Sequence, residues 1–144
     1  MIRVLTAALV LAGLTGVALA EDKTKSEPTT TTPHRVFELR TYYTNDGKLA
    51  DLHKRFRDHA CELLKKHGAE LIGFWTPQDD KDGKESKLIY LVAFPDREAA
   101  TKTWKEFSDD PEWKRVFAES HKNGVLVGKV ESVFLEPTDY SPIK

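Results

Sequence analysis

Three histidines between residues 53 and 67 have the side chains best suited to proton transfer or ligand binding. His53, His59 and His67 lie in a segment whose apolar residues recur at three- and four-residue spacing. At about 100° per residue on a helix, His53 and His67 fall within the apolar stripe and His59 falls at its edge. Imidazole titrates near neutral pH, so a histidine facing a sheet is a candidate general base or haem ligand. The alternative is a packed core histidine or, for His67, a favourable charge at a helix C-terminus.

Other reactive chemistry has little support. His53 and His59 are six residues apart, whereas a helical zinc pair uses a spacing of four, so no metal site is expected. GxSxG, HExxH and glycine-rich phosphate-binding motifs do not occur, which leaves hydrolase and nucleotide-binding activities unsupported. Cys61 is the single cysteine and lies in mid-helix, which predicts an inert thiol. The basic residues around Lys54 and Arg55 alternate with acidic ones and predict a solvated helix face.

Aromatic and charged residues supply a second set of candidates. An aromatic-lined pocket between helices and sheet would suit a flat apolar ligand, with core packing as the alternative. Its candidate residues are His53, Arg57, His59, Trp75, Tyr90 and Trp104. Glu38 and Arg40 alternate with Phe37, Leu39 and Thr41, so we expect them on the opposite face, taken here as the dimer face. There they would pair with each other or across a dimer, because a buried charge needs a partner.

These residues belong to a predicted βαββαβ order. Strands are expected at 36–43, 69–76, 87–94 and within 125–136, and helices at 48–67 and from Asp96 to about 107, with a restart at Asp110-Pro111 that continues to 123. Gly68 suits a left-handed helix stop, and Asp96 and Asp110 suit N-caps. The order predicts an α+β, ferredoxin-like antiparallel sheet with helices on one face.

Two of the strands are apolar on both faces. Residues 87–94 place Leu88, Tyr90, Val92 and Phe94 on one side and Ile89, Leu91 and Ala93 on the other. The strand at 69–76 places Ile72 and Phe74 on one side and Leu71 and Trp75 on the other. Two helices cover one face only, so we expect a homodimer joined through its sheets. Cover by loops or by the tail from Pro137 is the alternative.

The N-terminal third of the chain predicts export. Residues 1–20 have a positive start, a short apolar run and a small-x-small end at Ala20, as in a cleavable signal peptide. Residues 21–33 predict a flexible Thr/Pro linker, and residues 34–144 form one domain. Net charge is −1, which predicts neither a nucleic-acid partner nor stable membrane insertion after cleavage. The expected location is periplasmic or extracellular.

The domain resembles the NIPSNAP family of the dimeric α+β barrel superfamily. The segments that carry the resemblance are FELRTY (37–42), GKL (47–49), RFRDH (55–59), KHG (66–68), GFW (73–75), YLVAF (90–94), REAA (97–100), Trp104, DPEW (110–113) and FLEPTDYSP (134–142). This resemblance implies a ferredoxin-like fold paired into a dimeric α+β barrel. Related barrels include haem-degrading and cofactor-free monooxygenases.

Two hypotheses follow from the sequence. The first is a homodimeric binding or interaction module without catalytic activity. The second is a small oxygenase or isomerase acting on an aromatic or apolar substrate. The residues themselves predict no cofactor, and haem is the one group for which the superfamily resemblance gives a precedent.

Overall fold

The computed structural model describes residues 35–144, so the predicted signal peptide and linker lie outside the described residues. Four strands form one antiparallel sheet of order β2-β3-β1-β4. They are β1 (Val36–Thr44), β2 (Glu70–Trp75), β3 (Lys87–Phe94) and β4 (Val127–Leu135). Within residues 35–144 no helix has the length and apolar character that crossing a membrane requires.

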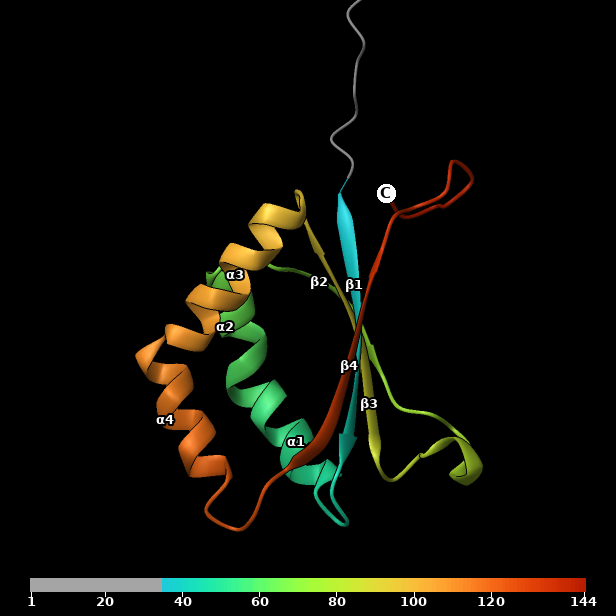
Figure 1. Ribbon diagram of the computed structural model, residues 1–144. Coiled ribbons are helices and arrows are strands. Elements are labelled where there is room, and N and C mark those ends of the chain that lie inside the picture. Colours follow the sequence, from blue (N-terminus) through green and yellow to red (C-terminus); the bar gives the residue numbers. More distant parts are fainter. Residues whose placement is uncertain (1–34) are drawn as a thin grey trace, which may run out of the picture. The chain divides into compact units, whose positions relative to one another are not determined.

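The long helical segments all lie on one face of this sheet (Figure 1). They are α1 (Leu49–Arg55), the π-helical turn η1 (Phe56–Ala60), α2 (Cys61–Lys66), α3 (Arg97–Asp109) and α4 (Pro111–Ser120). A short 3₁₀ turn, η2 (Asp80–Asp82), lies in the β2–β3 loop. The predicted βαββαβ order and the ferredoxin-like class are confirmed.

The predicted helix at 48–67 contains a π-helical turn in its middle. The N–H of Cys61 donates to the carbonyl of Phe56, a bond that spans five residues instead of four. A turn of this kind is wider than an α-helical turn and rotates everything that follows it about the helix axis. Gly68 then ends the helix with a positive φ of 100°, as expected.

The core lies between the helices and the sheet face that they cover. Tyr90, Val92 and Phe94 of β3 are fully buried there, together with Leu52 and Leu64 of the first helix. Phe56 packs against Tyr90 at 5.3 Å between ring centroids, and Phe74 stacks on Tyr90 at 5.2 Å. These contacts pack β3 against the first helix and against β2.

A bulge in β2 changes which residues share a face. Leu71 pairs with Val92 and Gly73 pairs with Leu91, so the register shifts at Ile72. The extra residue brings Leu71 and Phe74 to the same, helix-covered face, and Trp75 to the opposite one. The prediction that Leu71 shares a face with Trp75 is therefore wrong, because strict alternation does not survive an inserted residue.

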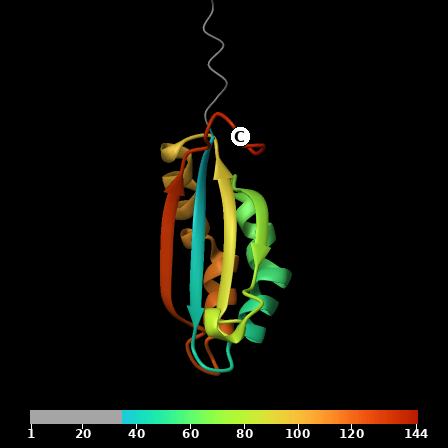
Figure 2. The ribbon, with the colours of Figure 1, turned by 90° about the vertical axis from the view of Figure 1, so that its right-hand side faces the viewer.

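The other sheet face, here called the open face, is apolar over much of its area. It carries Phe37, Leu39, Ile89, Leu91, Val133, Leu135 and Trp75. Val133 is 52% exposed and Trp75 is 53% exposed. Figure 2 shows this face in front of the helices, with the β2–β3 loop at one end and the C-terminal tail at the other. Arg35 lies over Phe37 and donates to the carbonyl of Lys144, so the tail reaches that end of the sheet.

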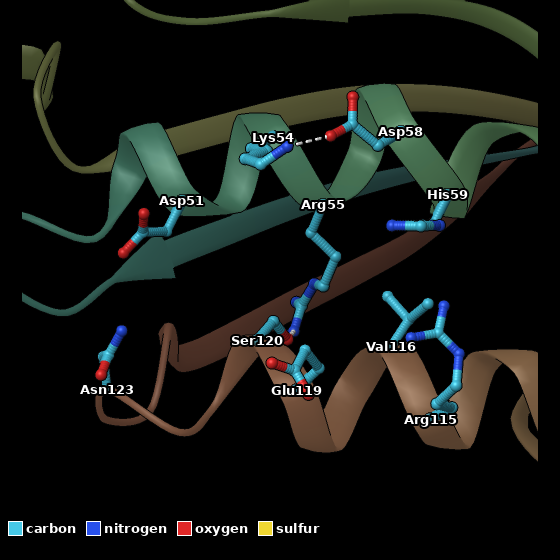
Figure 3. A pocket seen from close by; sticks show the side chains of 10 residues that line it. All are labelled: Asp51, Lys54, Arg55, Asp58, His59, Arg115, Val116, Glu119, Ser120 and Asn123. Atoms are coloured by element: carbon cyan, nitrogen blue, oxygen red, sulfur yellow. Dashed lines mark hydrogen bonds and ion pairs between the residues drawn. The ribbon is translucent and has the colours of Figure 1, made fainter.

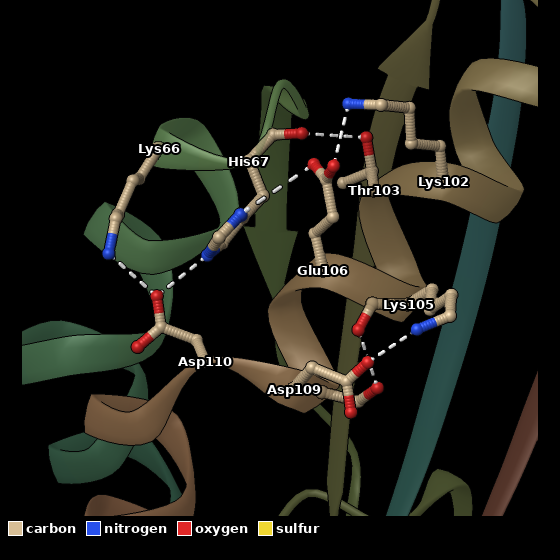
Figure 4. Close-up of polar contacts among 9 residues, drawn as sticks. Lys66, His67, Lys102, Thr103, Lys105, Glu106, Asp109 and Asp110 are labelled. Atoms are coloured by element: carbon tan, nitrogen blue, oxygen red, sulfur yellow. Dashed lines mark hydrogen bonds and ion pairs between the residues drawn. The ribbon is translucent and has the colours of Figure 1, made fainter.

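Asp110 joins the end of α2 to the beginning of α4 (Figure 4). One carboxylate oxygen, Oδ1, accepts from the backbone N–H of Glu112 at 2.8 Å and caps α4 as predicted. The other, Oδ2, contacts Lys66 Nζ at 2.7 Å and His67 Nε2 at 2.8 Å. These contacts, with Lys66 the largest cause, hold the pKa of Asp110 well below its usual range.

Replacing Asp110 by Asn tests this junction, because Asn still caps a helix but carries no charge. We expect D110N to lower the melting temperature at neutral pH. A carboxylate with a lowered pKa stabilises the fold fully above its unfolded pKa of about 4, and this stabilisation is lost as the pH falls through the folded pKa. The difference between wild type and D110N, measured by thermal denaturation, should therefore shrink as the pH falls below about 4.

D96N is the matched control. Asp96 also caps a helix, through the N–H of Ala99, but no ion pair of Asp96 is found among the described residues. A D96N variant as destabilised as D110N would contradict the role given to Lys66 and His67.

Candidate functional site

A cleft between the first helix and α4 contains an almost fully buried arginine, Arg55 (Figure 3). The α1–η1 side contributes Asp51, Lys54, Arg55, Asp58 and His59, and the α4 side contributes Arg115, Val116, Glu119, Ser120 and Asn123. The space amounts to about 650 Å³ with the solvent at its mouth included. We call it the helix cleft.

Arg55 extends from α1 across this cleft towards α4 and is only 5% exposed. Its Nη1 donates to Ser120 Oγ at 3.3 Å, and its buried Nε has no partner. The guanidinium carbon lies 5.3 Å from the ring centroid of Trp113 and 5.6 Å from that of Phe117. Burial lowers the pKa of Arg55, because desolvation disfavours its charged form.

The other charged groups of the cleft already have partners. Lys54 pairs with Asp58 four residues on, and Arg115 pairs with Glu112 at 2.6 Å. Glu119 pairs with Lys122 at 2.6 Å. His59 Nδ1 lies 3.8 Å from Glu112, at the cleft's outer edge. Arg55 is thus the buried charge of this cleft for which residues 35–144 supply no carboxylate within ion-pair distance.

A second depression, here called the edge hollow, lies beside strand β2. It brings together three of the predicted pocket residues, His53, Arg57 and Trp75. Phe56, Phe74 and Leu88 add apolar surface, and Cys61 also lines it. Burial raises the pKa of the Cys61 thiol, which keeps it protonated at neutral pH. An imidazole, a guanidinium and aromatic rings around one hollow would suit a flat ligand with a polar edge.

The remaining pocket candidates lie elsewhere. His59 lines the helix cleft. Tyr90 is buried in the core, where its hydroxyl donates to the hydroxyl of Tyr42 at 3.1 Å. Trp104 belongs to a polar network around Glu38. The six predicted pocket residues therefore occupy four places, and only His53, Arg57 and Trp75 converge.

Glu38 is the centre of a buried polar network on the helix-covered face. It is 1% exposed and accepts hydrogen bonds from Arg40 Nη1 at 2.9 Å, from the indole N–H of Trp104 and from Ser132 Oγ. The guanidinium of Arg40 also lies over the Trp104 ring, 4.1 Å from its centroid. One carboxylate thus satisfies donors from β1, α3 and β4.

The expectation that Glu38 and Arg40 lie on the dimer face is wrong. Glu38 pairs with Val92 and Arg40 pairs with Tyr90, and both of these partners face the helices. Glu38 and Arg40 do lie on the face opposite to Phe37 and Leu39, as predicted. However, Phe37 and Leu39 point to the open face, and the two charged residues point towards the helices. A strand with one apolar face normally turns that face to the core, and here the usual rule is reversed. The expected pairing of Glu38 with Arg40 is present.

Arg55 is the residue that sequence reasoning missed. The prediction that it lies on a solvated face is wrong, because α4 packs against the side of α1 from which Arg55 extends. One signal could have found it: Arg55 follows Leu52 by three residues and directly precedes Phe56, both of which are core residues.

The Glu38 network can be tested with E38Q. This variant removes the charge that compensates Arg40 and keeps the size of the side chain. We expect it to lower the free energy of unfolding by about 3 kcal/mol, because a buried charge left without its partner is costly. Denaturant titration measures the loss.

E131Q serves as the control, since Glu131 pairs with Lys129 at the surface. Exposed pairs contribute little. Equal stabilities of E38Q and wild type would show that Arg40 needs no counter-charge.

The fold and its sites define a ferredoxin-like α+β domain with helices on one sheet face and an apolar open face on the other. The sequence profile of the NIPSNAP family matches residues 37–142. This chain therefore belongs to the NIPSNAP family, as the resemblance in the sequence indicated.

Solved structures share the fold. A NIPSNAP family protein of unknown function from Agrobacterium tumefaciens superposes with a TM-score of 0.67 at 22% identity, covering 78% of this chain and 96% of that one. A second protein of the family from the same organism gives a TM-score of 0.67 at 22% identity, with coverages of 77% and 100%. A NIPSNAP domain protein from Burkholderia xenovorans gives 0.62 at 24%, with coverages of 74% and 98%. None of the curated proteins has a significant match to this chain.

Proposed function

We propose that this protein is an exported, homodimeric binding module whose two copies join through their open faces. The observation that carries the proposal is the apolar character of a sheet face that the helices leave uncovered. Monomeric proteins rarely leave a large continuous apolar patch in contact with water. Two such faces packed together would bury one another as in a β-sandwich.

The ends of the open face support pairing between two copies of the chain. The β2–β3 loop and the C-terminal tail both extend to the side of the sheet away from the helices (Figures 1 and 2). Tyr140 and Ile143 of the tail are exposed apolar side chains. Because these two segments lie at opposite ends of the sheet, they would flank a second sheet laid against the first. A two-fold arrangement would give each copy the same contacts.

Export is proposed from the sequence of residues 1–20 alone, whose charge, apolar run and small-residue end match a signal peptide. The binding role is proposed for the edge hollow. Trp75 belongs both to this hollow and to the open face, so pairing would place the partner's sheet beside the ligand. A small apolar or aromatic molecule is the ligand class that the lining favours.

V133K tests the dimer. Val133 is 52% exposed on the open face, so a lysine there is tolerated in a monomer but would bury a charge at a sheet-to-sheet interface. We expect wild type to elute as a dimer and V133K as a monomer in size-exclusion chromatography with light scattering.

Val125 provides a matched control, because it is 56% exposed and lies before β4, outside the sheet. V125K should remain dimeric. A monomeric wild-type protein at micromolar concentration would overturn the dimer proposal.

The second candidate function is a small oxygenase or isomerase, and the edge hollow is the observation that favours it. His53 is the one imidazole that lines this hollow, and it lies among Phe56, Phe74 and Trp75. An imidazole beside a bound aromatic is suited to take a proton from it.

H53A separates the two functions. With 1-naphthol as probe, binding should quench the tryptophan fluorescence of wild type, and a binding module should form no product with wild type or with H53A. An enzyme should consume the probe in wild type and lose at least about 100-fold of that rate in H53A. H59A is the control, since His59 lies in the helix cleft. Product analysis by mass spectrometry decides between the outcomes.

A further inference from the structure

We propose that the helix cleft is a binding site for a small organic carboxylate, with the guanidinium of Arg55 as its anchor. This site lies between two helices on the covered side of the sheet, away from the open face. It therefore depends neither on dimerisation nor on the edge hollow.

The first argument is the unsatisfied state of Arg55. A guanidinium has five N–H donors, and the described residues accept from one of its nitrogens, in the bond to Ser120 Oγ. Nε is buried and has no partner. A buried polar group without a hydrogen bond is costly, and a buried charge without a counter-charge is more so. The contacts with the Trp113 and Phe117 rings offset only part of this cost.

The second argument is the contrast with Arg40, another arginine that points towards the helices from the covered face of the sheet. Arg40 has a buried carboxylate at 2.9 Å and an aromatic ring beneath it. Arg55 has the aromatic rings but not the carboxylate. It faces a cavity instead. A ligand carboxylate in the helix cleft would supply Arg55 with the counter-charge that Glu38 supplies to Arg40.

The charges around the cleft select the class of anion. Asp51, Asp58 and Glu119 line the same space, and its other cations, Lys54 and Arg115, are already paired with carboxylates. Beyond Arg55 the cleft therefore offers a doubly charged phosphate no surplus of positive charge. A single negative charge that binds Arg55 in bidentate fashion neutralises the buried guanidinium with less repulsion. The buried side chain of Val116 lines the α4 wall and would contact the apolar part of such an acid. A monocarboxylate with a short apolar body is therefore the favoured ligand.

The test is a titration of the purified protein with sodium benzoate, at constant ionic strength, followed by ¹⁵N NMR of the arginine Nε–H groups. We expect a saturable shift of the Arg55 Nε–H signal, because a carboxylate bound to the guanidinium changes the charge next to Nε. Sodium phosphate and sodium chloride are the comparison titrations. Phosphate binding tighter than benzoate would overturn the carboxylate assignment, and the lack of a saturable benzoate shift would overturn the site.

Two substitutions of Arg55 test whether benzoate binding depends on its guanidinium. R55M removes the charge and fills its space with an apolar chain, a change that proteins often tolerate at buried charges, and it should abolish benzoate binding. R55K keeps the charge without the planar fork, so its affinity should fall at least about tenfold. R97M is the control, because Arg97 is exposed at the start of α3 and lines neither the helix cleft nor the edge hollow. Benzoate binding by R55M or R55K equal to that of wild type would refute the proposal, as would its loss in R97M.

Discussion

The structure depends on one constraint: a four-stranded sheet with apolar side chains on both faces has helices for only one of them. On the covered side, Tyr90 and Phe94 fill the space beneath the helices together with residues of the first helix. On the other side, Leu39, Leu91 and Val133 have no helical layer from residues 35–144 above them. Apolar side chains thus form a packed core on one face and an apolar surface without covering helices on the other.

Local signals in the sequence predicted most of the elements, because those signals act over a few residues. Asp96 and Asp110 cap their helices, Gly68 ends the first one, and β3 has the predicted bounds. What the sequence did not reveal are two inserted residues. The bulge at Ile72 and the π-helical turn at 56–60 each change the period of an element within it. Assigning faces from spacing assumes a constant period, so Leu71 was assigned to the wrong face. Arg55 was assigned to solvent for another reason: α4, which covers its side of α1, comes from a distant part of the sequence.

The site could be predicted only in part for a related reason. His53, Arg57 and Trp75 come together, because α1–η1 runs beside the edge of β2. The orientation of β1 could not be deduced, since apolar Phe37 and Leu39 would suit either face of a sheet that is apolar on both. Glu38 could be buried because Trp104 and Ser132 supply donors from distant parts of the chain. Contacts between residues that are distant in the sequence cannot be predicted from the spacing of residues within one strand.

The π-helical turn has a consequence for how this domain tolerates change in length. A π turn holds one residue more than an α turn, so losing one residue between 56 and 60 would leave ordinary α-helix in which Leu63 and Leu64 keep their present orientation relative to Leu49 and Leu52. Both leucines are buried, and in the shortened helix both would still face the core. A one-residue gap should therefore be tolerated better at this turn than elsewhere in the helix, where it would rotate the buried residues beyond it by roughly 100°.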